Sequence, residues 1–284
     1  MPLRLTRVLT LAALLLACSG APPTPTPSPT PNAGPLYLRA WLTQALPPPA
    51  LFGWGPMMTV SEAVMIDFNV AVPAIFPGPL MVLPNARGIS PAGQQTLIDQ
   101  ARELGLLSGE TDFTGGGVAP GGQTGHLLMI IDGERHELIG DPARTVRCEG
   151  LRCVADPGTA EAFAVFWRLL SDVSWLESQL GPARPYAPQR LAILVGPVQP
   201  QPDFQPNRLA WPLETSLADF GQPIAGDGDL RCGVVAGDAL PALLNALLQA
   251  NQLTIFVDAA GNERSLTARA LVSAEPSPCD GSEE

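Results

Sequence analysis

The chain has 284 residues, of which 46% are hydrophobic and only 15% are charged. This balance excludes an intrinsically disordered chain, and no repeated apolar runs of about 20 residues occur, as a multi-span membrane protein would need. The formal charge is −11 and all 16 basic residues are arginine, so the chain lacks the basic surface by which proteins bind nucleic acid. We expect no nucleic-acid partner.

Residues 1–17 have the form of a secretory signal peptide. Arg4 and Arg7 precede an apolar run, residues 8–16, that is too short to span a bilayer about 30 Å thick. The run ends in Leu15-Leu16-Ala17-Cys18, which resembles the lipobox of bacterial lipoproteins. The resemblance implies cleavage before Cys18, transfer of a diacylglyceryl group to its thiol, and acylation of the new amino terminus. The alternative is an ordinary signal peptide with a cysteine at this position by chance.

The lipid would hold the protein on the outer side of the cytoplasmic membrane, or on the outer membrane or cell surface. Residues 18–35 then form a spacer, because Pro alternates with Thr or Ser from Pro23 to Pro31. Such a segment adopts extended polyproline II and forms neither helix nor sheet. At about 3.1 Å per residue, residues 21–35 of this spacer have a length of roughly 45 Å. We expect this stalk to carry a folded body away from the lipid.

Four cysteines remain if Cys18 carries lipid, and an even number in an exported chain indicates disulfide bonds. Three connectivities are possible. We favour Cys148–Cys153, which would close a local loop around Gly150, together with Cys232–Cys279. A zinc site is the alternative, but the spacing of the four cysteines does not match the usual paired zinc knuckles.

The expected elements alternate between strand pairs and helices. The first elements in chain order are a strand in 36–45, a hairpin of Met58–Val60 and Ala63–Phe68 turning at Ser61-Glu62, and a helix from Ser90-Pro91 to Gly105. They are followed by a hairpin of residues 126–131 and 134–139 turning at Asp132-Gly133, and by a helix from Asp156 to about residue 180 that breaks near Val173. The last elements are strands at 191–195 and 232–236, a helix capped by Asp238, and a hairpin of residues 253–257 and 264–272.

The order of strand, helix and hairpin therefore occurs twice, around residues 57–139 and 191–272. We predict an α+β fold with helices packed on antiparallel sheet. Residues 36–186 and 187–284 would form two α+β halves that this order suggests are related, the second of them closed by its cysteines.

Short motifs in both halves are similar to a family of secreted bacterial lipoproteins of unknown function. In the second half they are Arg231-Cys232-Gly-Val-Val235, the segment Ala250–Thr254 and Cys279; in the first half they are Ile89-Ser90, Asp112-Phe113 and the Asp132-Gly133…His136 hairpin. The resemblance covers residues 57–279. It implies export and a cysteine-closed second half, and it carries no catalytic residues.

Motifs for common catalytic chemistries are missing. The glycine-rich segment 117–124 has Gln123 where a phosphate-binding P-loop has lysine, and it leads into a strand instead of a helix. The register expected around Asp132-Gly133 places His126 and His136 on opposite faces of the sheet, which argues against a shared metal. No G-x-S-x-G nucleophile elbow occurs. A glycosidase needs only two suitably placed carboxylates, which sequence cannot exclude.

Two groups of residues are candidates for binding. Asp227 and Asp229, in a short acidic turn, could hold Ca²⁺ but lack the spacing of an EF-hand; turn chemistry explains them equally well. Trp54 and Trp211 lie in loops, where an amphipathic ring can contact a partner.

We expect no cofactor and no metal. The expected function is a lipid-anchored, non-enzymatic module that binds an envelope protein or ligand; the alternatives are a small-ligand or ion sensor and a carboxylate-based hydrolase.

Overall fold

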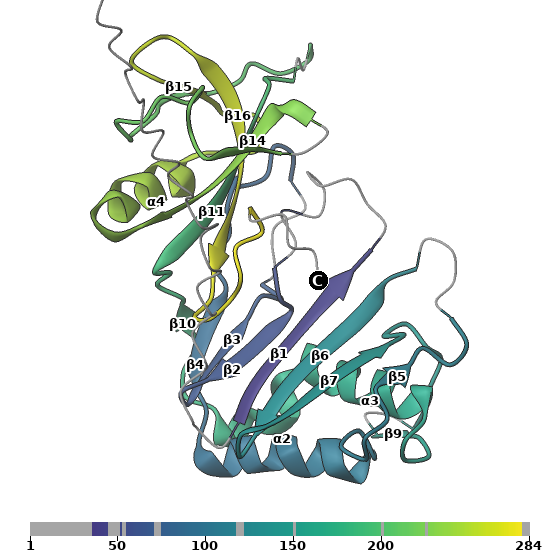
Figure 1. Cartoon of the computed structure of the whole chain (residues 1–284). Coiled ribbons are helices and arrows are strands. Elements are labelled where there is room, and N and C mark those ends of the chain that lie inside the picture. The colour runs from purple at the N-terminus through teal and green to yellow at the C-terminus, as the bar shows by residue number, and fades with distance from the viewer. Residues whose placement is uncertain are drawn as a thin grey trace, which may run out of the picture. The chain divides into compact units, whose positions relative to one another are not determined.

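The protein is described by a computed structural model covering residues 36–44, 52, 55–70, 75–117, 122–149, 152–199, 202–224 and 227–279. These residues belong to one compact unit, Pro31–Glu284. They form an eight-stranded sheet, a six-stranded sheet and an isolated two-stranded hairpin, with helices packed on the two larger sheets (Figure 1). The predicted α+β fold, with helices on largely antiparallel sheet, is confirmed.

The first sheet has the strand order β10-β4-β3-β2-β1-β6-β7-β5. Its strands are β1 (Leu36–Thr43), β2 (Met58–Ser61), β3 (Val64–Asp67), β4 (Asn85–Gly88), β5 (Asp112–Phe113), β6 (Thr124–Ile131), β7 (Glu134–Gly140) and β10 (Arg184–Pro185). All neighbours are antiparallel except β5 and β7. The long strands β1 and β6 form the centre, where alternate side chains face a covering layer of helices.

Tight turns set the register of both hairpins in this sheet. Asp132 and Gly133 have φ of 51° and 86°, as a two-residue primed turn requires, and Met129 pairs with His136 as predicted. In the β2–β3 hairpin, Ser61 pairs with Val64, so the turn residues are Glu62 and Ala63 instead of the expected Ser61-Glu62.

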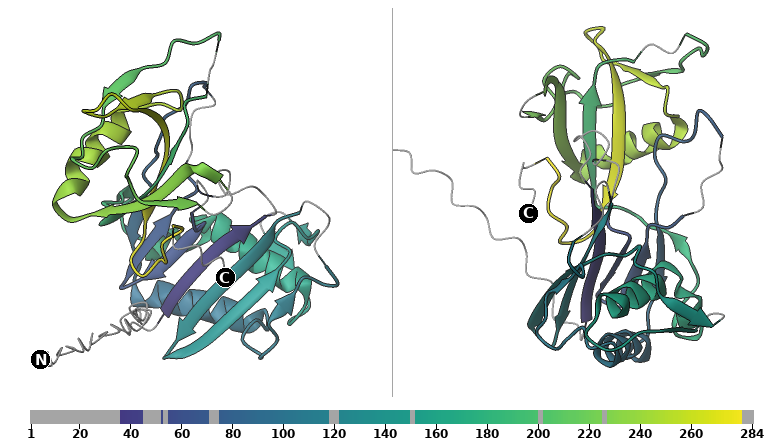
Figure 2. Two further views of the ribbon diagram at one scale, coloured as in Figure 1. Left: turned by 45° about the horizontal axis from the view of Figure 1, so that its top comes forward. Right: turned by 90° about the vertical axis from the view of Figure 1, so that its right-hand side faces the viewer.

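Helices cover one face of the first sheet, as Figures 1 and 2 show. They are α2 (Pro91–Glu103), α3 (Ala160–Ser171) and the 3₁₀ helix η1 (Val173–Gln179). Their apolar side chains and those of the covered strand face form one core around Phe163, Phe166 and Leu97. This buried area is what holds the helices to the sheet.

The second sheet has the order β12-β15-β16-β11-β14-β13. Its strands are β11 (Arg190–Gly196), β12 (Arg208–Ala210), β13 (Gln222–Ile224), β14 (Asp227–Ala236), β15 (Ile255–Val257) and β16 (Glu263–Leu271). The 3₁₀ helix η2 (Gly237–Ala239) leads into α4 (Leu240–Gln249), whose Leu243 and Leu247 pack on one sheet face against Phe256 and Leu191. A smaller apolar cluster around Ala192, Leu194 and Cys232 lies on the other face.

The two sheets share a plan but differ in one connection. Each has a central strand, β1 or β11, flanked on both sides by antiparallel neighbours. In the first sheet, the hairpin that follows α2 pairs with the central strand β1 through its first strand, β6. In the second sheet, the hairpin that follows α4 pairs with the central strand β11 through its second strand, β16. The repeated order of elements therefore does not reproduce one topology twice.

Three local expectations need correction. Asp238 lies inside η2, and the N-terminus of α4 has no side-chain cap. The helix expected from Asp156 begins at Ala160, because the Thr159 side chain caps it. Asp227 and Asp229 lie on strand β14, so the segment expected to be an acidic turn is extended.

Candidate functional site

An exposed apolar patch lies where two proline-rich loops meet. Ile75 is 65% exposed, Phe76 is 58% exposed and Phe204 is 42% exposed. The rings of Phe76 and Phe204 are in edge-to-face contact, with their centroids 5.1 Å apart. We call these three residues the apolar patch. Exposed apolar side chains that cluster in this way mark interaction sites more often than scattered ones do.

The loop that carries Ile75 and Phe76 is hydrogen-bonded at its base to the residues that follow α4. Gly78 donates a backbone hydrogen bond to Gln252 Oε1 at 3.1 Å, and the Gln252 backbone N–H donates to the Gly78 carbonyl at 3.0 Å. Leu80 donates to the Ala250 carbonyl, and Met81 is buried in the core of the second sheet. The loop therefore presents Ile75 and Phe76 from a fixed support.

The sequence around the patch is unusually free of charge. No charged residue occurs between Asp67 and Arg87, although this stretch includes the exposed loop. An exposed loop normally consists of polar residues, since nothing covers apolar side chains there. Its apolar composition is the feature by which sequence reasoning could have found the patch.

A group of polar and aromatic side chains lies on the face of the first sheet opposite the helices. The Arg39 guanidinium lies 4.7 Å from the centre of the Trp41 ring, and Trp41 stacks on His126 with centroids 5.1 Å apart. His126 Nε2 is 2.8 Å from the Thr43 hydroxyl. Burial lowers the pKa of His126, and the positive charge of Arg39 lowers it further. His126 and His136 face opposite sides of the sheet, as predicted.

The carboxyl groups give no support to acid catalysis. Each described carboxyl whose pKa is displaced has a lowered value: Asp112, Glu161, Asp172, Glu177 and Asp258. Hydrogen bonds to the ionised form are the leading cause in every case, whereas a glycosidase acid needs a raised pKa. Asp258, for example, accepts hydrogen bonds from Asn262, Ala260 and Leu217 and organises the turn between β15 and β16.

Both predicted disulfides are present. Cys148–Cys153 joins β8 (Arg147–Glu149) to β9 (Arg152–Val154), and Cys232–Cys279 ties the carboxyl-terminal segment to β14. A shallow opening of about 320 Å³ lies beside the second bridge, and Arg190, Gln222 and Ser277 contribute to its lining. None of the described residues that line it carries a carboxylate.

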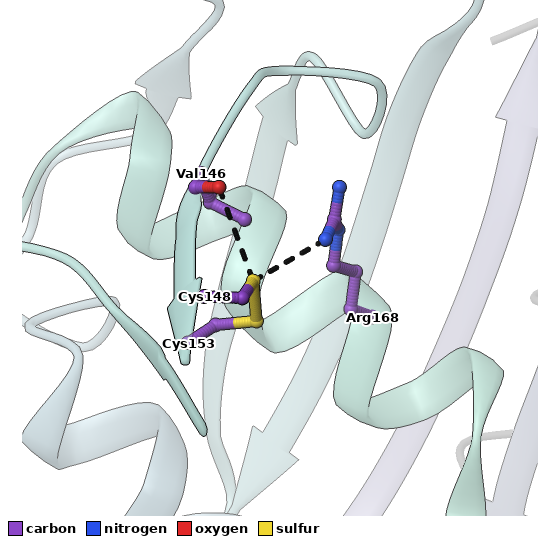
Figure 3. Close-up of a disulfide and its surroundings, with 4 residues drawn as sticks. All are labelled: Val146, Cys148, Cys153 and Arg168. Carbon is purple, nitrogen blue, oxygen red and sulfur yellow. Dashed lines mark hydrogen bonds between the residues drawn. A yellow bond between two sulfur atoms is a disulfide. The ribbon is translucent and has the colours of Figure 1, made fainter. Parts of the chain in front are cut away.

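Cys148 has a charged neighbour. Arg168 in the last turn of α3 donates from Nη1 to the Cys148 Sγ at 3.4 Å (Figure 3). Cys148 and Cys153 are both partly exposed; in the second bridge Cys279 is partly exposed and Cys232 is buried.

The remaining predicted residues are distributed as follows. Trp211 is only 7% exposed, and its Nε1 donates to the Thr215 carbonyl; its ring packs on Phe220 and Phe256, so it is a core residue and not the expected partner contact. Asp229 is exposed on β14. Cys18 and Trp54 lie outside the described residues.

The described part of the chain adds neither a metal site nor a membrane-spanning helix to these features. No group of three or more His, Cys, Asp or Glu side chains there is placed to hold a metal ion. No helix in that part is long and apolar enough to cross a membrane.

Comparison with known proteins adds no relative. No protein-family model matches the chain, and neither does any curated protein or solved structure.

Proposed function

We propose that this chain is an exported protein, anchored by lipid at Cys18, whose body binds a protein of the cell envelope through the apolar patch. The observation that carries the proposal is the contact between Phe76 and Phe204 at the exposed end of a firmly supported loop. Aromatic side chains in a fixed position are the usual anchors of protein interfaces, because they bury a large area at low entropic cost.

Export is supported by two independent features of the chain. The amino-terminal sequence has the order of a lipobox, with Cys18 directly after Ala17. The body contains two disulfides, which form and persist in oxidising compartments outside the cytoplasm.

The stalk favours a protein partner over the lipid surface. Residues 21–35 would extend over roughly 45 Å, at about 3.1 Å per residue, between the lipid and the body. The chain also carries a net charge of −11, which opposes close approach to anionic lipid. A patch that served the membrane itself would gain nothing from such a spacer.

Replacing the lipid acceptor tests the anchor. Cys18→Ser should move the protein from the membrane fraction to the soluble fraction after cell breakage, since the acyl chains provide the anchoring. The proteins with and without this change would be compared by fractionation and intact mass. A Cys18→Ser variant that stays in the membrane fraction would contradict the lipid anchor.

Crosslinking from the patch tests the partner separately. A photo-crosslinking amino acid at position 76 should capture one stoichiometric envelope protein in intact cells. Val154, which is 68% exposed on β9, is the matched control position and should capture none. Adding Phe204→Asp to the position-76 variant should abolish the adduct. Capture of lipid alone, or the same protein from position 154, would refute the assignment of the partner surface.

A further inference from the structure

The hairpin that carries Cys148 and Cys153 belongs to neither large sheet. Cys148 and Cys153 are directly paired residues of β8 and β9, and these two strands form a sheet of their own. The segment before the hairpin is tied to the first turn of α3 by the ion pair of Arg144 and Glu161, at 2.8 Å. The hairpin thus lies along α3, with the Arg144 contact at one end of the helix and the Arg168 contact at the other.

The two sulfur atoms of this bridge differ in their surroundings. Cys148 Sγ accepts a hydrogen bond from the Arg168 guanidinium, whereas no described residue donates to the Sγ of Cys153 (Figure 3). A neighbouring guanidinium favours the thiolate form of a cysteine and lowers its pKa. In thiol–disulfide exchange, the sulfur with the lower thiol pKa is the better leaving group. The geometry therefore favours attack on Cys153, with Cys148 as the leaving thiolate.

We propose that Cys148–Cys153 is a thiol–disulfide exchange site for a dithiol, with Arg168 as the residue that stabilises the departing Cys148 thiolate. The other bridge, Cys232–Cys279, has a structural role, because Cys232 is buried in the apolar cluster on β11 and β14. This proposal does not depend on the lipid anchor or on the apolar patch.

The exchange balances as a two-electron transfer. One thiolate of the dithiol attacks Cys153 Sγ, the protein S–S bond breaks, and its electron pair goes to Cys148 Sγ beside Arg168. The second thiol of the dithiol loses its proton and attacks the mixed disulfide at the dithiol's own sulfur, which releases Cys153 as a thiolate. The dithiol leaves as a disulfide, and the two protein thiolates take up the two protons that it lost.

The two bridges of one chain provide an internal comparison. The full-length mature protein would be treated with limiting dithiothreitol, quenched with iodoacetamide at successive times, and analysed by peptide mass spectrometry. Cys148 and Cys153 should become alkylated at least about tenfold faster than Cys232 and Cys279, since both sulfur atoms of the first bridge belong to partly exposed residues and its leaving group is stabilised, whereas Cys232 of the second bridge is buried. Equal rates for the two bridges would overturn the proposal.

Substitution of Arg168 separates its effect from simple exposure. Arg168→Gln should slow reduction of Cys148–Cys153 by about threefold and leave Cys232–Cys279 unchanged. Arg147→Gln is the matched control. It removes an exposed arginine from β8, the strand that carries Cys148, and leaves the contact between Arg168 and Cys148 Sγ in place. No change on Arg168→Gln, or an equal change on Arg147→Gln, would remove Arg168 from the mechanism.

Single-cysteine variants test which sulfur leaves. The Cys148 thiol in a Cys153→Ala variant should react with iodoacetamide at pH 7 about threefold faster than the Cys153 thiol in a Cys148→Ala variant, because more of it is ionised. Adding Arg168→Gln should abolish the difference. Circular dichroism would establish that each variant is folded. Equal reactivity in folded variants would refute the asymmetry on which the proposed direction of attack depends.

Discussion

Some single residues of this protein are tightly constrained because a strand passes close under a helix. Gly140 ends β7 beneath α3, and a Cβ atom at this position would overlap the Phe163 ring. The ring in turn stacks near Phe113 and Trp167 in the first core. Glycine is needed here for close approach of a strand and an aromatic side chain, and not for an unusual backbone angle.

Gly140→Ala should lower the free energy of unfolding by about 1–3 kcal/mol, because the Phe163 ring must shift in a packed core. Gly88→Ala is the matched control, since a Cβ there meets nothing within 4 Å. Urea denaturation of the three proteins would measure both effects. Similar stabilities for the two variants would mean that the core adjusts around position 140.

His126 should make stability depend on pH near neutrality. Its pKa in the folded protein lies below the unfolded value, first because it is buried and then because of Arg39. The unfolded chain therefore binds the proton more readily, so the contribution is fully present above the unfolded pKa of about 6.5 and is lost as the pH falls through the folded pKa. Denaturation at a series of pH values should show a smaller decline for His126→Asn than for the wild type. Parallel profiles would contradict this assignment.

Helices α2 and η1 begin where a side chain accepts a hydrogen bond from a free backbone N–H group of the first turn. Ser90 accepts a hydrogen bond from the Gly93 N–H and Pro91 follows as the first helical residue, as predicted. After α3 ends at Ser171, the Asp172 side chain caps η1. The predicted break near Val173 is therefore confirmed, and Asp172 is the cap of the helix that follows it.

Two substitutions compare a cap that the structure contains with one that it lacks. Thr159→Ala should lower stability by about 1 kcal/mol, because the Thr159 hydroxyl accepts from the Ala162 N–H at the start of α3. Asp238→Ala should change stability by less than about 0.5 kcal/mol, as expected for a surface position that makes no cap. Chemical denaturation would distinguish them, and equal losses would mean that Asp238 caps α4 in solution.

At the scale of the molecule, a buried carboxylate brings together arginines from distant parts of the chain. The Glu275 side chain is fully buried; its Oε1 lies 2.5 Å from Arg269 Nη1 and 3.9 Å from Arg39 Nη2. Its backbone carbonyl accepts from Arg190. Arg39 belongs to β1 of the first sheet, whereas Arg190 and Arg269 belong to the second. Glu275 therefore links the segment before Cys279 to strands of both sheets.

Glu275→Gln should lower the free energy of unfolding by about 3 kcal/mol, because it leaves two largely buried guanidinium groups without their carboxylate. Glu263→Gln is the matched control: its ion pair with Arg208 is largely exposed and should contribute at most about 1 kcal/mol. Thermal and urea unfolding would measure both. A loss at Glu275 no larger than that at Glu263 would show that the buried pair adds nothing to stability.

Features that depend on a few neighbouring residues were predictable from the amino-acid sequence. The register at Asp132-Gly133, the cap at Ser90 and the Cys148–Cys153 loop follow from turn geometry, capping and chain proximity. The α+β class followed from the order of these local patterns. The Cys232–Cys279 pairing was predicted because only these two cysteines remained after Cys18 was assigned to the lipid and Cys148 to Cys153.

Features that depend on contacts between residues far apart in the chain became known from the three-dimensional structure. It placed Trp211 in the core, although its proline-rich surroundings had indicated an exposed loop. It brought Phe76 to Phe204, Glu275 to Arg39, and Arg168 to Cys148. Local propensity and periodicity carry no information about such meetings, since they arise when sheets and helices bury their apolar faces against one another.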